Sequence, residues 1–289
     1  MRTVFVAGAT GYLGRYLCAE YKRRDWTVLA LVRDKDRAAD LACDRLIEAE
    51  ATEPATLTGT MESVDLVVSA LGITRQADGL GYRDVDYQAN LNLLREAQRS
   101  EVPHFAYVHV LNADRMRGVP LVDAKADFVT ELRRADLAST IIAPSGYFSD
   151  MADFLGMARA GRVWLFGDGR HRINPIDGAD LAAATADAID EGKQWLDVGG
   201  PESFSHTELA ELAFSALGRP AKITRLPDWI RKAALAILPW VTPRKVHGPA
   251  QFFLTAFGMD MVGEKRGTRH LAGFFRRRID SDMTGDDGR

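Results

Sequence analysis

Three glycines near the start of the chain, Gly8, Gly11 and Gly14, have the spacing of a phosphate-binding turn. They follow Thr3–Ala7, an apolar run typical of a strand buried on both faces, and precede a segment with the pattern of a helix. In this context the first glycine allows a sharp turn, the second leaves room for a pyrophosphate, and the third lets the helix pack closely on the sheet. The phosphates would bind N–H groups at the helix N-terminus. The pattern predicts a dinucleotide site formed by Gly8, Thr10, Gly11, Tyr12, Leu13 and Gly14.

The residues after the second predicted strand bear on which dinucleotide is bound. This strand covers residues 26–32 and ends where the adenosine ribose of such a cofactor would lie. An arginine there suits the 2′-phosphate of NADP, whereas an acidic residue suits the 2′-hydroxyl of NAD. Arg33 therefore favours NADP(H), while the neighbouring Asp34 keeps NAD(H) open.

The elements that must position these residues alternate between strands and helices. Further strands are predicted at 46–49, 64–71, 105–110 and 139–143, with helices at 82–99 and 120–135 between them. This alternation predicts an α/β fold with a Rossmann-type, doubly wound parallel sheet, whose ligand lies outside the carboxyl ends of the strands. The residues expected to contact the cofactor at those ends are Leu71, Gly72, Pro144, Tyr147 and Phe148, although the two aromatic residues could instead belong to the core.

Length and composition are those of an ordinary globular protein with a large core: the chain has 289 residues, 46% hydrophobic and 27% charged. We expect a Rossmann domain over residues 1–150, to which residues 173–200 return. Residues 151–172 and 201–280 are expected to form a smaller, discontinuous substrate lobe. Residues 281–289 are polar and acidic, and we expect them to form a disordered tail.

Several classes of function and location are disfavoured. A net charge of −3 gives no electrostatic case for binding nucleic acid. Two cysteines, Cys18 and Cys43, are too few for a disulfide framework, and no apolar run reaches the roughly eighteen residues of a membrane span. The first strand begins at once, which we expect to leave no room for a signal peptide. These features favour a cytoplasmic protein, and we assign no metal site.

Several stretches together carry a family resemblance. They are Gly8–Gly14, Val85–Leu94, Phe105–Val110, Ile173–Ala182 and Val198–Ser205. As a set, spread over roughly residues 1–220, they resemble the extended short-chain dehydrogenase/reductase superfamily, in its atypical NmrA-like and isoflavone-reductase-like branch. The resemblance implies an NAD(P)-binding protein.

The chain departs from that superfamily at its usual catalytic groups, which are a serine after the fifth strand and a tyrosine four residues before a lysine. Lys125 matches the lysine, but Leu121 stands at the tyrosine position and His109 at the serine position. A leucine cannot exchange a proton with a carbonyl or an alcohol, so the usual reaction is not expected. Lys125 could bind the nicotinamide ribose, protonate a substrate, or be an ordinary helix lysine.

The function predicted from these residues is that of an NADP(H)-dependent oxidoreductase acting on an apolar small molecule. Our hypothesis is hydride transfer from NADPH, with His109 or Lys125 supplying the proton, since a histidine has an ordinary pKa near 6.5. His109 could instead be a structural residue at a strand end. The alternative function is a non-catalytic NAD(P)(H)-binding sensor or assembly factor. Epimerase or dehydratase chemistry is a third possibility, against which the missing tyrosine counts.

Residues 228–257 contain two very apolar segments, 228–241 and 252–257. They could form core, line the pocket of an apolar substrate, dock a protein partner or touch a membrane surface. Core or pocket lining is favoured, because the first helix is short and the following Arg244 and Lys245 make its flank only modestly basic.

Overall fold

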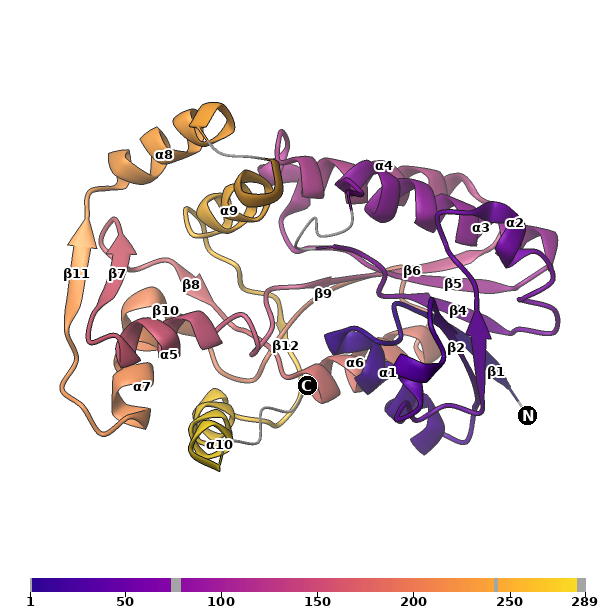
Figure 1. Ribbon diagram of the computed structural model, residues 1–289, viewed down its shortest axis with the longest axis horizontal. Helices are drawn as coiled ribbons and strands as arrows, with labels where there is room; N and C mark the ends of the chain where they lie inside the picture. The colour runs from indigo at the N-terminus through magenta and orange to yellow at the C-terminus, as the bar shows by residue number, and fades with distance from the viewer. Residues whose placement is uncertain (1, 74–78, 242–243, 285–289) are drawn as a thin grey trace.

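A computed structural model describes residues 2–73, 79–241 and 244–284 of the chain. Within them, one large sheet of eight strands separates two layers of helices (Figure 1). In spatial order the strands are β12 (Glu264–Lys265), β9 (Trp195–Gly199), β6 (Ala138–Pro144), β5 (His104–Val108), β4 (Leu66–Ser69), β1 (Thr3–Ala7), β2 (Thr27–Val32) and β3 (Arg45–Glu48). Every neighbouring pair is parallel. The order reverses between β1 and β4, which is the switch point at which ligands bind in this topology.

The two helical layers explain why the strands are apolar on both faces. Helices α1 (Tyr12–Arg23) and α6 (Gly178–Asp190) cover one face, and α2 (Pro54–Leu57), α3 (Asn90–Arg99) and α4 (Pro120–Arg134) cover the other (Figure 1). Along β1, Val4 and Val6 enter the core beneath α1 and α6, whereas Phe5 and Ala7 enter the opposite core. This alternation is typical of a buried parallel strand, and the predicted doubly wound α/β fold is confirmed.

The helix predicted over residues 82–99 is not uniform. Its first part, η2 (Arg83–Ala89), is a π-helix that continues into α3. The side-chain amide of Asn90 donates to the carbonyl oxygens of Val85 and Asp86 at 3.1 and 3.2 Å, and accepts from the Ser69 hydroxyl at 2.5 Å. A side chain inserted into the backbone ladder accounts for the wider turn, and such turns are frequent at functional sites.

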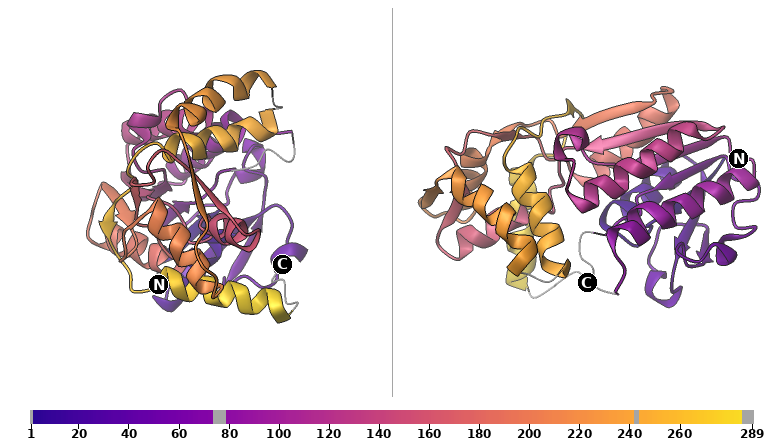
Figure 2. Two further views of the ribbon diagram at one scale, coloured as in Figure 1. Left: turned by 90° about the vertical axis from the view of Figure 1, so that its left-hand side faces the viewer. Right: turned by 90° about the horizontal axis from the view of Figure 1, so that it is seen from above.

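The remaining elements form a smaller lobe beside the carboxyl ends of the strands (Figures 1 and 2). They are α5 (Ala152–Arg159), β7 (Val163–Phe166), β8 (Arg172–Ile173), β10 (Phe204–Ser205), α7 (His206–Ala216), β11 (Ile223–Leu226), α8 (Asp228–Val241), α9 (Arg244–Ala256) and α10 (Leu271–Thr284). Two short 3-10 turns, η1 (Asp36–Ala38) and η3 (Ala113–Met116), come earlier in the chain, after β2 and after β5. Strand β7 pairs in parallel with β11, and β8 pairs antiparallel with β10. The α8–α9 pair and α10 lie on opposite sides of this lobe (Figure 2).

The predicted domain boundaries stay a prediction, with two corrections. Within residues 173–200, strand β9 pairs with β6 in the large sheet, whereas Ile173 of β8 pairs with Phe204 of the lobe. Strand β12 also joins that sheet, although its residues fall within the range predicted for the lobe. Helix α10 continues to Thr284, so the predicted tail is helical at its start, and residues 285–289 lie outside the described part. No helix among the described residues is both long and apolar enough to cross a membrane.

Candidate functional site

Two cavities meet at the glycine turn between β1 and α1. One measures about 440 Å³ and the other about 570 Å³. Both are lined by Gly8, Gly11, Ala70, Gly72 and Ile73, which follow the carboxyl ends of β1 and β4. An extended ligand could therefore lie across the turn with one end in each cavity. We call the smaller the apolar cavity and the larger the Arg33 cavity.

The backbone of the turn fits a pyrophosphate. Gly8 has a φ of +77°, and a Cβ there would lie 2.9 Å from the backbone of Ala70. A Cβ on Gly14 would lie 2.7 Å from Cα of Ala9 and closer still to the Gly8 carbonyl oxygen. Gly11 is the N-cap of α1, and in the described part of the chain no side-chain oxygen caps the N–H groups of that first turn. The turn thus offers close backbone approach and unsatisfied donors to an anion.

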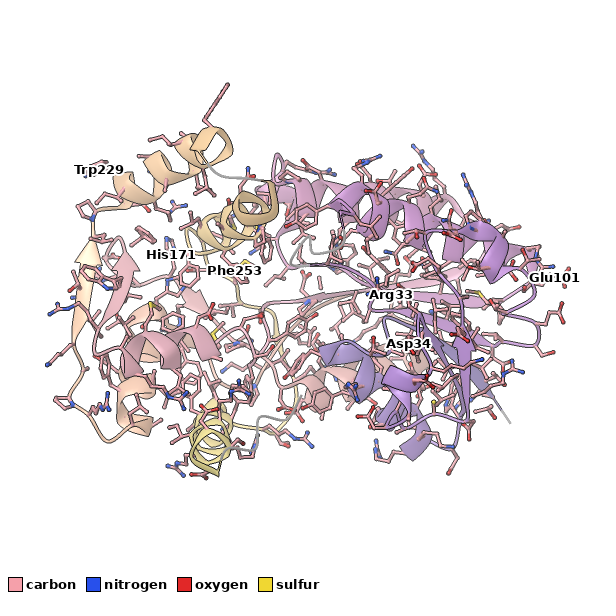
Figure 3. The ribbon with its side chains drawn as sticks, in the orientation of Figure 1. Arg33, Asp34, Glu101, His171, Trp229 and Phe253 are labelled. Atoms are coloured by element: carbon pink, nitrogen blue, oxygen red, sulfur yellow. The ribbon has the colours of Figure 1, made fainter. Side chains whose placement is uncertain are left out.

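The Arg33 cavity contains the groups expected to recognise an adenosine ribose. Thr10, Arg15, Arg33 and Asp34 line it, and the last two, labelled in Figure 3, directly follow the end of β2. The Asp34 carboxylate accepts the backbone N–H of Asp36 at 2.9 Å, so one of its oxygens is used within its own loop. This arrangement supports the predicted preference for a 2′-phosphate over a 2′-hydroxyl.

Replacing Arg33 with alanine tests this preference. A hydrogen bond to a charged group contributes about 1.5–3 kcal/mol, so R33A should weaken NADPH binding by about ten- to a hundredfold and leave NADH binding nearly unchanged. Isothermal titration calorimetry with both cofactors measures the difference. The control is K35A, whose lysine pairs with Glu48 at 3.3 Å. Equal losses for NADPH and NADH in R33A would remove Arg33 from this role.

Lys125 lies at the floor of the apolar cavity in a buried ion pair. Its ammonium is 3.2 Å from Oδ1 of Asp86 and donates to the Val108 carbonyl at 3.2 Å and to the Tyr107 hydroxyl at 3.4 Å. Asp86 is fully buried on η2, and burial raises the pKa of its carboxyl group while Lys125 opposes that rise. Gly72 packs against the pair, because a Cβ there would lie 2.6 Å from Oδ1 of Asp86. Lys125 lines the cavity, and its positive charge is already paired with the carboxylate of Asp86.

Asp86 was not predicted to be a partner for Lys125. The residue lies within the family-like stretch Val85–Leu94, but its carboxylate meets Lys125 only because α4 packs against η2. The signal that could have identified it is its position: an acidic residue on the buried face of a predicted helix usually has a charged partner. Ribose binding by Lys125 stays a prediction.

His109 lies at the wall of the apolar cavity, and its surroundings disfavour the protonated imidazole that would donate a proton. It is buried after β5, beside the ring of Trp195 at 5.8 Å, and its Nδ1 has no hydrogen-bond partner in the described part of the chain. Burial, reinforced by the positive charge of Lys125, lowers the pKa of His109 to about 3. The imidazole is therefore neutral near pH 7, which argues against the predicted role of His109 as a proton donor and leaves it a hydrogen-bonding group.

This low pKa has a consequence for stability. An unfolded histidine has a pKa near 6.5, so below that pH the unfolded chain binds a proton that His109 in the folded chain does not bind. The free energy of unfolding therefore falls by up to about 1.4 kcal/mol for each pH unit below 6.5. His206, whose pKa burial lowers to about 4, contributes in the same direction. Urea unfolding of the wild type and of H109N at pH 7, 6 and 5 should show a shallower loss in H109N. Equal slopes would contradict the buried, neutral state of His109.

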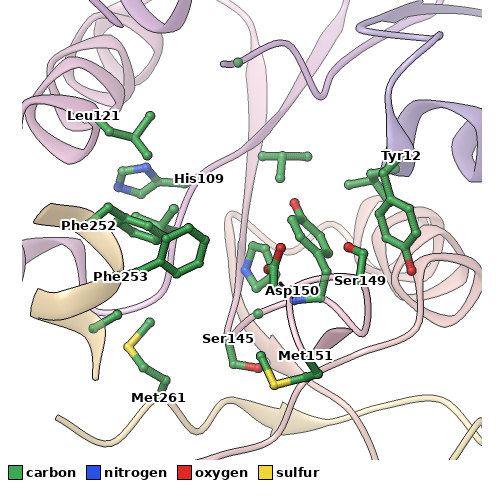
Figure 4. Close-up of a pocket in the computed structure, with 18 of the residues that line it drawn as sticks. Tyr12, His109, Leu121, Ser145, Ser149, Asp150, Met151, Phe252, Phe253 and Met261 are labelled. Atoms are coloured by element: carbon green, nitrogen blue, oxygen red, sulfur yellow. Dashed lines mark hydrogen bonds between the residues drawn. The ribbon is translucent and has the colours of Figure 1, made fainter. Parts of the chain in front are cut away.

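The walls of the apolar cavity differ in chemistry. Leu121 of α4 and Phe252 and Phe253 of α9 lie near His109 on one side, as Figure 4 shows. Tyr12, Ser149 and Asp150 lie on the other side, the last two on the loop after β6. The further lining residues from the lobe are mostly apolar and include Met151, Phe154, Ile173, Leu209, Ala256, Phe257 and Met261. Such a cavity suits an apolar molecule that is held by a few polar groups.

Two of the three residues predicted to contact the cofactor at the end of β6 and on the loop after it line the apolar cavity, and their contact with the cofactor stays a prediction. Pro144 and Tyr147 line the apolar cavity. Phe148 does not: it is 1% exposed and packs in the core of the lobe against Phe274, with ring centroids 5.8 Å apart. Phe148 begins a turn, in which the backbone N–H of Asp150 donates to the Tyr147 carbonyl and that of Met151 donates to the Phe148 carbonyl, and this turn places the Phe148 ring in the lobe core. The prediction that Phe148 contacts the cofactor is therefore wrong.

Comparison with known proteins agrees with this geometry. A family described as NAD(P)H-binding matches residues 8–191. The divinyl chlorophyllide a 8-vinyl-reductase of Zea mays is 31% identical over 263 residues, which are 82% of this chain and 64% of that protein. The photosystem II assembly factor Ycf39 of Synechocystis sp. is 27% identical over 230 residues, 78% of this chain and 70% of that protein. The chain thus spans less than two thirds of the maize reductase.

Solved structures show the same fold. The NADPH-dependent quinone oxidoreductase QOR2 of Escherichia coli, crystallised with NADPH, has a TM-score of 0.74 at 20% identity, and the match covers 96% of this chain and 99% of that one. An isoflavone reductase has a TM-score of 0.70 at 17% identity, covering 89% of this chain and 87% of that one. The predicted resemblance to the atypical short-chain dehydrogenase/reductases is confirmed, and the chain belongs to the NAD(P)H-binding family.

Proposed function

We propose that the protein is an NADPH-dependent reductase of an apolar, conjugated small molecule. The observation that carries this proposal is the apolar cavity of about 440 Å³, which adjoins the glycine turn and is walled by Leu121, Phe252 and Phe253. Bound NADPH supplies a hydride. The chain's own residues would hold the substrate among aromatic side chains and exclude water, which favours transfer to a conjugated acceptor over exchange with solvent.

Different residues around the glycine turn would hold different portions of the cofactor. Backbone N–H groups at Gly11–Gly14 would bind the pyrophosphate, and Thr10 with Arg33 would bind the phosphate on the adenosine ribose. Lys125 would hydrogen-bond the nicotinamide ribose while keeping its contact with Asp86. Leu71 and Gly72, after β4, would lie along the cofactor.

The relatives support a reductase without naming its substrate. The maize relative is named for reducing a vinyl group of a chlorophyllide, and the Escherichia coli structure is of a quinone reductase. Both names describe flat, conjugated acceptors. A substrate of that class would suit a cavity that has aromatic walls on α9.

The proposal is tested by NADPH oxidation with a panel of naphthoquinones under anaerobic conditions, followed by absorbance of NADPH. We expect turnover that saturates with the quinone and is faster with NADPH than with NADH. A matched variant is F253S, which opens the aromatic wall and should raise KM more than it lowers kcat. No turnover with any acceptor, despite tight NADPH binding, would contradict the reductase.

A second candidate function, a non-catalytic assembly factor or sensor, is favoured by the surface of α8. Trp229, Ile237 and Trp240 on this helix are 66%, 53% and 88% exposed, and Figure 3 shows Trp229 at the outer edge of the lobe. Exposed apolar residues on one helix are typical of a contact with a protein partner. The Ycf39 relative is named as an assembly factor. A chain that binds NADPH without oxidising it, with the α8 face bound to a protein partner, would support this alternative.

We also propose that the protein works in the cytoplasm. Cys18 and Cys43 are both free thiols in the structure, Cys18 in the core and Cys43 partly buried. Free thiols are typical of a reducing compartment. Fractionation of the native host measures the location directly.

A further inference from the structure

The apolar cavity contains a carboxyl group that the sequence analysis did not single out. Asp150 lies on the loop between β6 and α5, and its side chain lines the cavity opposite Leu121 and His109 (Figure 4). Its Oδ2 accepts the backbone N–H of Tyr147 at 3.1 Å, which fixes the carboxyl group in the turn. In the described part of the chain, no N–H or O–H group donates to Oδ1 of Asp150. One oxygen is thus anchored while the other remains available to the cavity.

We infer that Asp150 donates the proton that completes reduction of the substrate held in the apolar cavity. This inference rests on the proposed reductase function. It also explains how a chain with Leu121 at the usual tyrosine position could still supply a proton. The acid would come from the opposite wall, on the loop after β6, rather than from α4.

Four other polar groups of the cavity are poorer proton donors. The Ser145 hydroxyl already donates to the Asn174 carbonyl at 2.6 Å. Burial raises the pKa of the Tyr147 phenol, so that it holds its proton well above pH 10. His109 and His206 are buried and neutral, with pKa values of about 3 and 4. A neutral imidazole would have to become an anion in order to act as an acid.

The surroundings of Asp150 suit it to this step. Burial raises the pKa of its carboxyl group to about 6; the Tyr147 N–H opposes the rise and the nearby Asp153 adds to it. The other titratable groups that line the same cavity are Tyr12, Asp86, His109, Lys125, Tyr147 and His206, and the Asp86 and Lys125 charges compensate each other. A carboxylic acid with a pKa near the working pH can both give up a proton and regain one.

The proposed step balances. The conjugated acceptor gains two electrons and one hydrogen as the hydride, which leaves a negative charge on its oxygen. The Asp150 O–H bond breaks, the proton forms a new O–H bond on that oxygen, and Asp150 is left as a carboxylate. Water from the open side of the cavity returns a proton to Asp150 before the next cycle.

The experiment compares the wild type with D150N and D150S in the full-length protein. Asparagine keeps an oxygen for the Tyr147 N–H but carries no acidic proton. With naphthoquinone as the acceptor, we expect kcat to fall by about a hundredfold in both variants, since a positioned acid contributes about 10²–10⁴ in rate. Wild-type kcat should decline above about pH 6, and the residual rate of D150N should not depend on pH. The control D153N alters an exposed neighbour and should keep a rate close to that of the wild type, with the decline of kcat moved slightly to lower pH because the Asp153 charge no longer raises the pKa of Asp150.

A second measurement does not depend on turnover. Infrared difference spectra of the wild type against D150N, taken without cofactor, should show one protonated carboxyl group that titrates near pH 6. A D150N enzyme within threefold of the wild-type rate, or spectra without that carboxyl group, would overturn the inference. A wild type that binds no NADPH or reduces no acceptor contradicts the proposed function instead, and the infrared titration separates the two failures.

Discussion

The variant K125M should lose about 3–5 kcal/mol of unfolding free energy, because it leaves the fully buried carboxylate of Asp86 without its counter-charge. The loss should depend on pH. Since burial raises the pKa of Asp86, the native state can keep a proton that the unfolded chain has already lost. The destabilisation of K125M should therefore be smallest near pH 5 and grow towards pH 8. Urea unfolding at several pH values measures both effects.

Two further variants isolate the buried pair. In the double variant K125M/D86N the remaining side chain is neutral, so most of the lost stability should return. In K22M the exposed pair of Lys22 with Asp44, 2.6 Å apart, is broken, and the cost should stay below about 1 kcal/mol. A K125M protein as stable as K22M at every pH would contradict a compensated ion pair at the floor of the cavity.

The second large effect is expected from G14A. The added methyl group would strike the Gly8 carbonyl and Cα of Ala9, so α1 must move away from β1. Overpacking of this kind costs about 1–3 kcal/mol of stability. Displacing the first turn of α1 also removes hydrogen bonds to a charged pyrophosphate, each contributing about 1.5–3 kcal/mol, so NADPH should bind about a hundredfold more weakly. Calorimetry and urea unfolding measure the two losses.

The matched control is G156A. Gly156 lies within α5, and a Cβ there meets no atom within 4 Å. Alanine is the better helix former, so this variant should be as stable as the wild type or more stable, by up to about 1 kcal/mol, with unchanged NADPH binding. A G14A protein that matches G156A in both measurements would show that the turn tolerates a side chain.

The fold could be predicted from the sequence because its signals are local. The apolar run Thr3–Ala7, the glycines after it and the helix that follows lie in one short segment, and the strand and turn match the structure. Strand β9 is covered only at its end, by the family-like stretch Val198–Ser205. Strands β2, β3, β4, β5 and β6 were predicted in the same way as β1, within a few residues at their ends. The two-residue strand β12 was not, since it carries no pattern of its own and exists only because β9 offers an edge.

The chemistry of the site depends on packing between distant segments. His109 could be placed at a strand end, but its pKa reflects burial beside Trp195, which belongs to another strand. Asp86 acquires its partner only when α4 packs on η2. Asp150 becomes a cavity group only because the lobe, including Phe252 and Phe253, closes over the loop after β6. Burial of a charged group is a property of the whole fold, and spacing along the chain does not reveal it.

We propose that the backbone at the start of α1 binds the diphosphate of a nicotinamide dinucleotide, between the two cavities that share Gly8 and Gly11. Calorimetric titration of the purified wild-type chain with NADPH and with NADH tests it most directly. We expect one site per chain that binds NADPH more tightly than NADH. The absence of binding heat with both cofactors, at several temperatures, would contradict it.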